Sequence, residues 1–232
     1  VDNTGCLHNP CRWITLEDIM FRREIRRCLW LFLLCIPVFC PAEISVEPIP
    51  GLANEFIRGA DVSMLSSIEE HGGKFYDRSG MEADALAILR DNGVNWIRLR
   101  LWNDPVDSSG QGLGGGDNDL ERTILMATRA KKLGLKLLLD FHYSDFWADP
   151  GKQTKPRAWQ DLSPDELADA VYRFTFDSLK ALAAAGAFPD MVQIGNETNG
   201  GMLWPEGKTW QANPAEKIGG YDGFSRLLSA GA

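Results

Sequence analysis

Apolar stretches and amphipathic stretches alternate along the chain beyond Pro50. Four apolar runs predict strands, at residues 56–62, 94–101, 135–141 and 191–195. A polar loop and an amphipathic helix follow the runs. Because parallel strands need a crossover connection, this alternation predicts parallel βαβ units and an α/β fold.

Three helices are expected between the strands. The first two are predicted near residues 81–91 and 120–133, each ended by a glycine, Gly93 and Gly134. The third carries the strongest start signal: Ser163 is the expected N-cap, Pro164 occupies the first turn, and Glu166 completes a capping box. Gly186 is the expected end of this helix.

Two architectures fit these elements, a (β/α)8 TIM barrel and an open doubly wound sheet. A nucleotide-binding open sheet should place a glycine-rich turn directly after its first strand, but this strand runs into "GADVSML" with Asp61. A formal GxGxxG at 110–115 leads into acidic residues that would repel a phosphate. The loops therefore favour the barrel. Since a full barrel needs about 250 residues, four βα units make about half of one.

The segment "MFRREIRRCLWLFLLCIPVFCPA" has the layout of a secretory signal peptide. Four arginines precede an apolar run at 28–40, and the small Ala42 suits cleavage. The alternatives are an ordinary buried helix and a lipoprotein signal, which the bulky Phe39 before Cys40 disfavours. The expected division is upstream non-native read-through at 1–19, a signal peptide at 20–42, a Pro-rich lead at 43–55 and the catalytic domain at 56–232.

A secreted protein without disulfides is the consequence of this division. All five cysteines lie in the first forty residues, so the mature part would contain none. The formal net charge of −8 argues against nucleic acid and anionic membranes as partners. We expect a monomer, with no membrane association once the signal is removed.

Polar and aromatic residues gather where each predicted strand ends. This end of the strands carries the catalytic groups in α/β barrels. The residues are Asp61 after the first strand, Arg98, Arg100 and Trp102 at the second, His142, Asp145 and Trp147 at the third, and Asn196 and Glu197 at the fourth.

Strand parity places Arg98, Arg100 and Trp102 on one face of the second strand. Two arginines on one face of a central strand require partners or ligands. Arg100 lies nearer the strand end and is assigned to the site, whereas Arg98 is assigned to a structural ion pair.

Each candidate also has a plain structural interpretation. His142 alone could be a hydrogen-bonded core histidine, and Glu197 could cap a helix or pair with an arginine. Trp102, Trp147 and Trp204 could be packing residues, although their places beside Asp, Asn and Gly suggest a platform that stacks sugar rings. No second His or Cys stands at metal-ligand spacing, so no metal site is expected.

Four strings, "IRGADVSML", "NWIRLRLWNDP", "LLLDFHYSDFWADPGKQ" and "VQIGNETNGGMLWP", together resemble glycoside hydrolase family 53, the arabinogalactan endo-β-1,4-galactanases. The resemblance implies a retaining glycosidase that hydrolyses the β-1,4-galactan of pectin side chains without a cofactor. It further implies that Glu197 is the acid/base and that Asn196 binds the sugar 2-hydroxyl. Arg100 and His142 would support the cleavage subsite, and Asp61 and Asp145 would lie within reach of substrate.

One element of the family pattern is missing. The family's nucleophile is a Glu at the end of the seventh strand, and Glu206, Glu216 and Asp222 follow Glu197 too closely to fill that place. The chain is therefore expected to be the N-terminal half of the enzyme and inactive alone. Calcium, which later loops bind in some bacterial members, would belong to the other half.

Other functions remain open. They are a related (β/α)8 glycosidase that acts on mannan or xylan, a non-catalytic sugar-binding module and, as the weakest, a nucleotide-binding α/β protein.

Overall fold

The computed structural model describes residues 49–53 and 55–232. The predicted read-through segment, the signal peptide and most of the Pro-rich lead lie outside the described residues. Residues Ala53–Ala232 form one compact unit, which contains every element described below.

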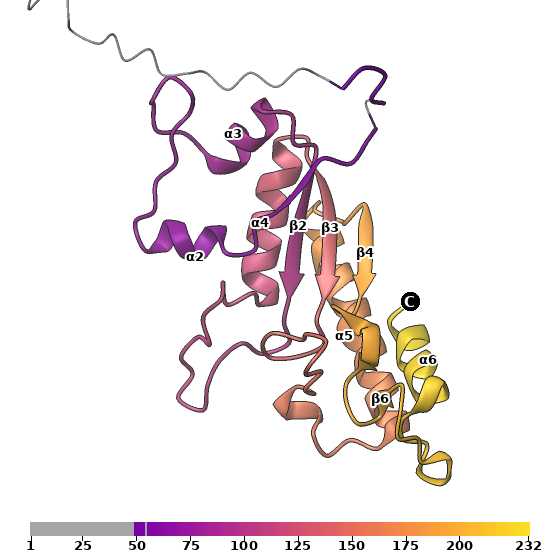
Figure 1. Cartoon of the computed structure of the whole chain (residues 1–232). Helices are drawn as coiled ribbons and strands as arrows, with labels where there is room; N and C mark the ends of the chain where they lie inside the picture. Colours follow the sequence, from indigo (N-terminus) through magenta and orange to yellow (C-terminus); the bar gives the residue numbers. More distant parts are fainter. Residues whose placement is uncertain (1–48, 54) are drawn as a thin grey trace, which may run out of the picture. The chain divides into compact units, whose positions relative to one another are not determined.

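A parallel sheet of four strands forms the centre of this unit (Figure 1). Its order follows the chain, with β1 (Gly59–Asp61), β2 (Trp96–Leu101), β3 (Lys136–Phe141) and β4 (Met191–Ile194) side by side. The predicted alternation is confirmed, but the strands are shorter than predicted at one or both ends. The first strand differs most, because Phe56 and Ile57 are exposed and do not join the ladder.

Helices α3 (Ala85–Asp91), α4 (Leu120–Lys132) and α5 (Pro164–Ala184) fall where the sequence predicts them. The capping box at the start of α5 is confirmed. The prediction for α3 is wrong by four residues at its start. Residues 76 and 82 form a β-bridge, and Asp84 is the N-cap whose side chain accepts hydrogen bonds from Leu86 N and Ala87 N.

Several short elements have no counterpart in the sequence prediction. They are α2 (Leu65–Glu70), the turns η1 (Arg157–Trp159), η2 (Thr198–Gly200) and η3 (Pro214–Glu216), and the antiparallel pair β5 (Gly201–Met202) and β6 (Gly207–Lys208). Helix α6 (Gly220–Gly231) packs against α5 and β6.

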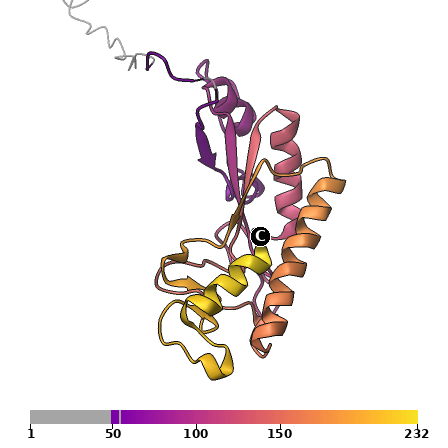
Figure 2. The ribbon, with the colours of Figure 1, turned by 90° about the vertical axis from the view of Figure 1, so that its right-hand side faces the viewer.

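The two faces of the sheet differ in chemistry. Helices α4 and α5 cover one face (Figure 2), where alternate residues of β2 and β3 form the core: Ile97, Leu99, Leu101, Leu137, Leu139 and Phe141. The other face carries the remaining alternate residues. The ladder sets Asp61 beside Arg98, and Arg100 beside Asp140. The prediction that both arginines share one face is confirmed, and it is the face opposite the helices.

Candidate active site

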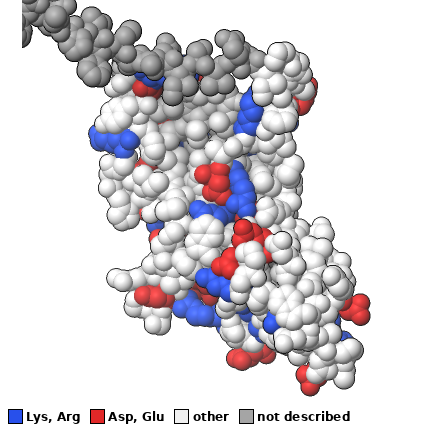
Figure 3. All heavy atoms as spheres, viewed as in Figure 1, with Lys and Arg blue, Asp and Glu red and all other residues white. Residues whose placement is uncertain are grey.

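Arg98 connects three strand ends on the polar face. Its Nη1 donates to Asp61 Oδ2 at 2.6 Å, and its Nη2 donates to Asp140 Oδ2 at 2.5 Å and to Asn196 Oδ1 at 2.9 Å. Charged side chains gather in the middle of this view of the surface (Figure 3). The predicted ion pair of Arg98 is therefore confirmed, and it joins two of the predicted site residues.

Asp140 is the acceptor that the sequence prediction missed. It is 0% exposed, and His142 Nε2 lies 3.0 Å from the same Oδ2 that binds Arg98. His142 Nδ1 accepts a hydrogen bond from Ala148 N, so the ring proton belongs on Nε2. Nε2 makes no hydrogen bond of good geometry with the described residues. The sequence "LLLDFHY" contained the signal for this residue, because a carboxylate inside an apolar strand needs a buried partner. The His142 ring is buried behind the surface.

Asn196 has a fixed amide orientation. Because Arg98 only donates, the atom facing it must be the Asn196 oxygen. The Asn196 Nδ2 then donates to Ala148 O at 2.8 Å, which leaves its second N–H available to a ligand. Gln153, a second residue that the sequence analysis did not single out, donates from Nε2 to Asn196 O.

Glu197 follows β4 in a left-handed conformation, with φ 49° and ψ 49°. A residue with a side chain rarely adopts this conformation, and such residues collect at functional sites. The side chain is exposed, and its carboxylate makes no hydrogen bond or ion pair with the described part of the chain. Glu197 thus presents a free carboxyl group next to the amide of Asn196.

Arg100 is held among aromatic rings. It is 4% exposed, its guanidinium lies 4.1 Å from the Trp147 ring centroid, and its Nε lies 3.7 Å from Asp61 Oδ1. Burial lowers the pKa of Arg100, and the charge of Asp61 opposes that shift. Nε and Nη1 have no hydrogen-bond partner among the described residues.

The prediction that Trp102, Trp147 and Trp204 together form a sugar-stacking platform is wrong for Trp102, because this side chain is 0% exposed. Phe146 and Trp147 pack on its ring, and Gly115 closes over it at φ 67°, where a Cβ would lie 3.1 Å from the indole. Trp147 is 37% exposed.

Trp204 is partly exposed and forms an edge contact with the exposed Trp210, whose ring centroid lies 5.2 Å away. The sequence analysis did not select Trp210. Among the tryptophans of the described residues, the accessible ones are therefore Trp147 and the Trp204–Trp210 pair.

Asp145 links the loop after β2 to the start of η1 by hydrogen bonds. Its carboxylate accepts hydrogen bonds from Asp104 N at 3.1 Å and Arg157 N at 2.8 Å. Burial raises the pKa of this carboxyl despite those donors. No hydrogen bond joins it to Arg98, Asn196 or Glu197 in the part of the chain that the structure describes.

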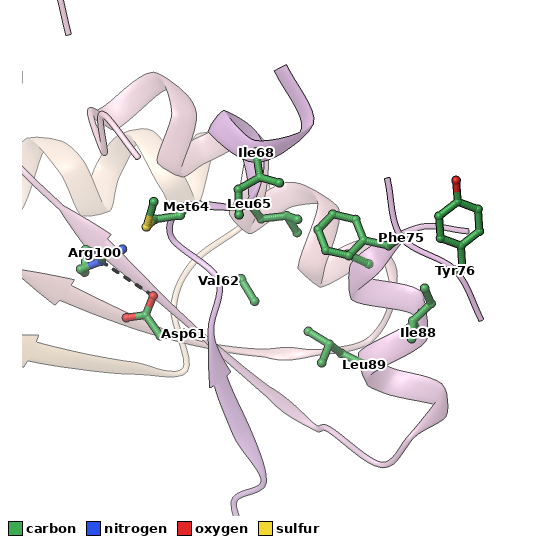
Figure 4. Close-up of a pocket in the computed structure, with 11 residues that line it drawn as sticks. Asp61, Val62, Met64, Leu65, Ile68, Phe75, Tyr76, Ile88, Leu89 and Arg100 are labelled. Atoms are coloured by element: carbon green, nitrogen blue, oxygen red, sulfur yellow. Dashed lines mark ion pairs between the residues drawn. The ribbon is translucent and has the colours of Figure 1, made fainter. Parts of the chain in front are cut away.

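A cavity of about 380 Å³ lies between β1, α2 and α3 (Figure 4). Asp61 and Arg100 stand at one end of it, and most of its lining is apolar, including Leu65, Ile68, Phe75, Ile88 and Leu89. Such a lining does not suit a polar sugar chain. The two residues were predicted to bind substrate, and here they border an apolar space beside the edge strand.

The glycine-rich loop at 110–115 is shaped by acidic residues. Asp117 Oδ1 accepts from Gly114 N, and Asp119 caps α4 through Arg122 N. These carboxylates occupy the donors that a phosphate would need. Within the described ranges, no group of three or more His, Cys, Asp or Glu side chains could hold a metal ion.

Asp61 should make the stability of the protein sensitive to acid. Burial acts to raise the pKa of its carboxyl, but hydrogen bonds from Ser63, the charge of Arg100 and a hydrogen bond from Arg98 outweigh burial, so the pKa lies below its ordinary 3.8. A lowered pKa in the folded state stabilises the protein above about pH 4, and this stabilisation is lost as the pH falls through the folded-state pKa.

We therefore expect Asp61→Asn to reduce the loss of stability between about pH 6 and about pH 3. The midpoint of urea unfolding at each pH measures this loss. Asp177→Asn, at an exposed position on α5, serves as the control. An acid-induced loss in Asp61→Asn equal to that of the unmodified chain would contradict the prediction.

The four strands are parallel and lie in chain order. Helices between them cover one face, and polar groups lie on the other face and at the carboxyl ends. This arrangement defines the α/β class of the (β/α)8 TIM barrels. The described part holds four such βα units. The sequence model of glycosyl hydrolase family 53 matches residues 57–232. The chain belongs to this family.

Named relatives agree with this assignment. The chain is 45% identical over 160 residues to an endo-beta-1,4-galactanase of Bacillus subtilis (strain 168), covering 69% of this chain and 37% of that protein. It is 38% identical over 193 residues to arabinogalactan endo-beta-1,4-galactanase A of Aspergillus niger, covering 83% of this chain and 50% of that protein.

Solved structures show the same partial coverage. The GH53 catalytic domain of Ignisphaera aggregans superposes with a TM-score of 0.75 at 52% identity, over 81% of this chain and 50% of that domain. A structure of fungal beta-1,4-galactanases gives a TM-score of 0.64 at 36% identity, over 76% of this chain and 48% of that one. The chain thus spans half or less of the length of these proteins.

Proposed function

We propose that this chain supplies the acid/base half of a retaining endo-β-1,4-galactanase, with Glu197 as the general acid/base. The observation that carries the proposal is the pair of residues that follows β4. Glu197, whose backbone is left-handed, has an exposed carboxyl group without a partner among the described residues, and it follows Asn196, whose amide Arg98 orients. Rigid strand ends are the places from which barrel enzymes aim such groups.

The chemistry assigned to these residues is proton transfer and sugar binding. Glu197 would protonate the oxygen of the leaving group and later deprotonate the attacking water. The second N–H of Asn196 would donate to a sugar 2-hydroxyl, a hydrogen bond that strengthens as the oxocarbenium-like transition state forms. Trp147 and the Trp204–Trp210 pair offer apolar faces against which sugar rings can stack.

Retention requires a second carboxylate about 5 Å from the first. Asp61 and Asp140, the carboxylates bound to Arg98, are occupied by that ion pairing. We assign the nucleophile to the half of the fold that the relatives possess beyond the region matched here. The chain alone would then bind galactan without hydrolysing it.

The remaining assignments follow from the sequence. We infer a secreted monomer that acts on the galactan of arabinogalactan and pectin, needs no cofactor in this half, and has calcium, if any, in the other half. In the described residues, no helix is long and apolar enough to cross a membrane. The signal peptide on which secretion rests lies outside the described residues.

The decisive test uses a hybrid protein in which this chain replaces the matching half of a relative. Residues 57–232 replace the matched half of the Ignisphaera aggregans catalytic domain, and reducing-sugar release is measured on linear β-1,4-galactan, mannan and xylan. We expect activity on galactan. Glu197→Gln should lower kcat by roughly 10²- to 10⁴-fold, because the variant cannot transfer the proton. Glu216→Gln, at an exposed position in η3, is the matched control.

Each alternative gives a different result. A folded hybrid with greater activity on mannan or xylan would indicate a related glycosidase with another substrate. Oligosaccharide binding without hydrolysis, unaffected by Glu197→Gln, would indicate a sugar-binding module. Equal kcat values for Glu197→Gln and Glu216→Gln would refute the role assigned to Glu197.

A further inference from the structure

Residues 153–155, here called the connector segment, run between the end of β4 and the loop that carries Trp204. The segment itself belongs to the long loop after β3. Neither the ion pairs of Arg98 nor the proposed proton transfer uses it. Its first and third side chains, Gln153 and Lys155, are nevertheless buried and polar.

On one side the connector segment binds the main chain at the acid/base. The Gln153 amide is 2% exposed and faces three carbonyl oxygens. Its Nε2 lies 2.8 Å from Asn196 O, 3.4 Å from Glu197 O and 3.2 Å from Asp149 O. A buried amide nitrogen has two N–H groups to donate, and here every nearby acceptor is a main-chain carbonyl. The Glu197 carbonyl belongs to the residue in the left-handed conformation.

On the other side the connector segment binds the aromatic loop. Gln153 O accepts a hydrogen bond from Trp204 N at 2.8 Å, and Thr154 forms a parallel bridge with Trp204. Lys155 Nζ pairs with Glu206 Oε1 at 2.9 Å. One residue, Gln153, therefore contacts Glu197 through its side chain and Trp204 through its main chain.

We propose that Gln153 is a positioning residue that couples the aromatic loop to the acid/base. A sugar ring stacked on Trp204 and the carboxyl of Glu197 then keep a fixed spacing, because both peptides are bound to the same residue. The role of this coupling in sugar binding and proton transfer rests on the proposed function. The physical link between Glu197 and Trp204 does not depend on the identity of the sugar.

A glutamine suits this place better than an apolar residue of the same size. An apolar side chain would fill the volume but would leave the Asn196 carbonyl without this donor and would remove the 3.4 Å contact with Glu197 O. Unpaired buried carbonyls favour a rearranged main chain. The residue whose conformation is left-handed is the one expected to move first.

The test follows backbone amide and tryptophan indole signals by NMR in the intact chain labelled with ¹⁵N. Gln153→Met keeps the size of the side chain and removes both donors. Gln160→Met is the control for the loss of a glutamine donor, because the exposed Gln160 donates to one main-chain carbonyl, Lys155 O, and does not contact Asn196 or Glu197. β-1,4-Galactotetraose is then titrated into each protein.

We expect Gln153→Met to shift the Glu197 amide and the Trp204 amide and indole signals, while Trp96 and Trp159, in the core, keep theirs. Galactotetraose should bind roughly 10-fold more weakly, the effect of one lost hydrogen bond at the upper end of the usual range. Gln160→Met should leave the Glu197 and Trp204 signals unchanged.

Shifts spread over Trp96 and Trp159 as well would mean a general loss of structure and would overturn the proposal, as would unchanged signals at Glu197 and Trp204. Should Gln153→Met not fold, Gln153→Asn tests the same link, because it keeps both donors but draws them back from the carbonyls by one methylene. It must shift the Glu197 amide and the Trp204 amide, and their constancy would overturn the proposal. Local shifts in a chain that binds no galactotetraose would support the coupling and refute the proposed function.

Discussion

Lys155→Met is expected to lower the free energy of unfolding by about 3–5 kcal/mol, the usual cost of removing one partner from a buried ion pair. The ammonium and the Glu206 carboxylate lie 2.9 Å apart, and their side chains are only 6% and 9% exposed. Lys155 Nζ also donates to Gln160 O. Without the lysine, Glu206 is a buried charge, and its Oε2 already has no hydrogen-bond partner among the described residues. Urea unfolding followed by circular dichroism measures the change.

Two further variants separate charge from packing. Lys155→Met combined with Glu206→Leu should recover most of the loss, because apolar replacement of a whole buried pair is often neutral. Lys74→Met, which breaks the surface pair with Glu82, should cost only about 0–1 kcal/mol. A double variant as unstable as Lys155→Met alone would show that the lost lysine packing, and not the unpaired carboxylate, dominates.

Asp140→Asn is the second change with a large expected effect, about 3 kcal/mol of destabilisation. The side chain keeps its shape but loses the charge that Arg98 and His142 face. Arg98 and Arg100 are then left on one face of β2 with Asp61 as the remaining carboxylate bonded to Arg98. Mutual repulsion of the two guanidinium groups contributes to the cost.

A double-mutant cycle with Arg98→Met isolates the interaction between Arg98 and Asp140. Each single variant leaves an unbalanced charge, whereas the double variant leaves Arg100 with Asp61. We expect the double variant to be more stable than the sum of the single changes predicts, by about 1–3 kcal/mol. Additive changes in the free energy of unfolding would mean that the two groups do not interact.

The order and type of the main elements could be predicted because each carries its own local signal. Ser163, Pro164 and Glu166 mark the start of α5 through chemistry confined to one turn. Helix α2 lacks such a signal: Met64 occupies its N-cap position and makes no side-chain cap. Its six residues are too few for periodicity to show. The late start of α3 depends on a short hairpin in which the bridge between Tyr76 and Glu82 closes over a turn at Asp77–Gly80. Asp77 and Gly80 carry the local signal of that turn, which the prediction overlooked.

From the sequence, strand parity predicts only which side chains share a face of the sheet. Parity places Arg98 and Arg100 on one face, but register with β1 and β3 decides which partners each one meets. Register sets Asp61 beside Arg98, so Arg98 became the centre of the ion pairs, while Arg100 lies against Trp147. The same parity applied to "LLLDFHY" would have found Asp140 next to His142. The burial of Trp102 depends on loops from two other parts of the chain.

The order of the strands in the sheet has a consequence for synthesis. Strands β1 to β4 lie side by side in the order in which the ribosome makes them, and each one pairs with the strand completed just before it. Pairing between successive units keeps the intervening chain short. The growing polypeptide can therefore add one βα unit at a time, with the latest strand always at the open edge. The peptide that carries Glu197 therefore follows a strand that pairs with β3, after β1 to β3 have been made.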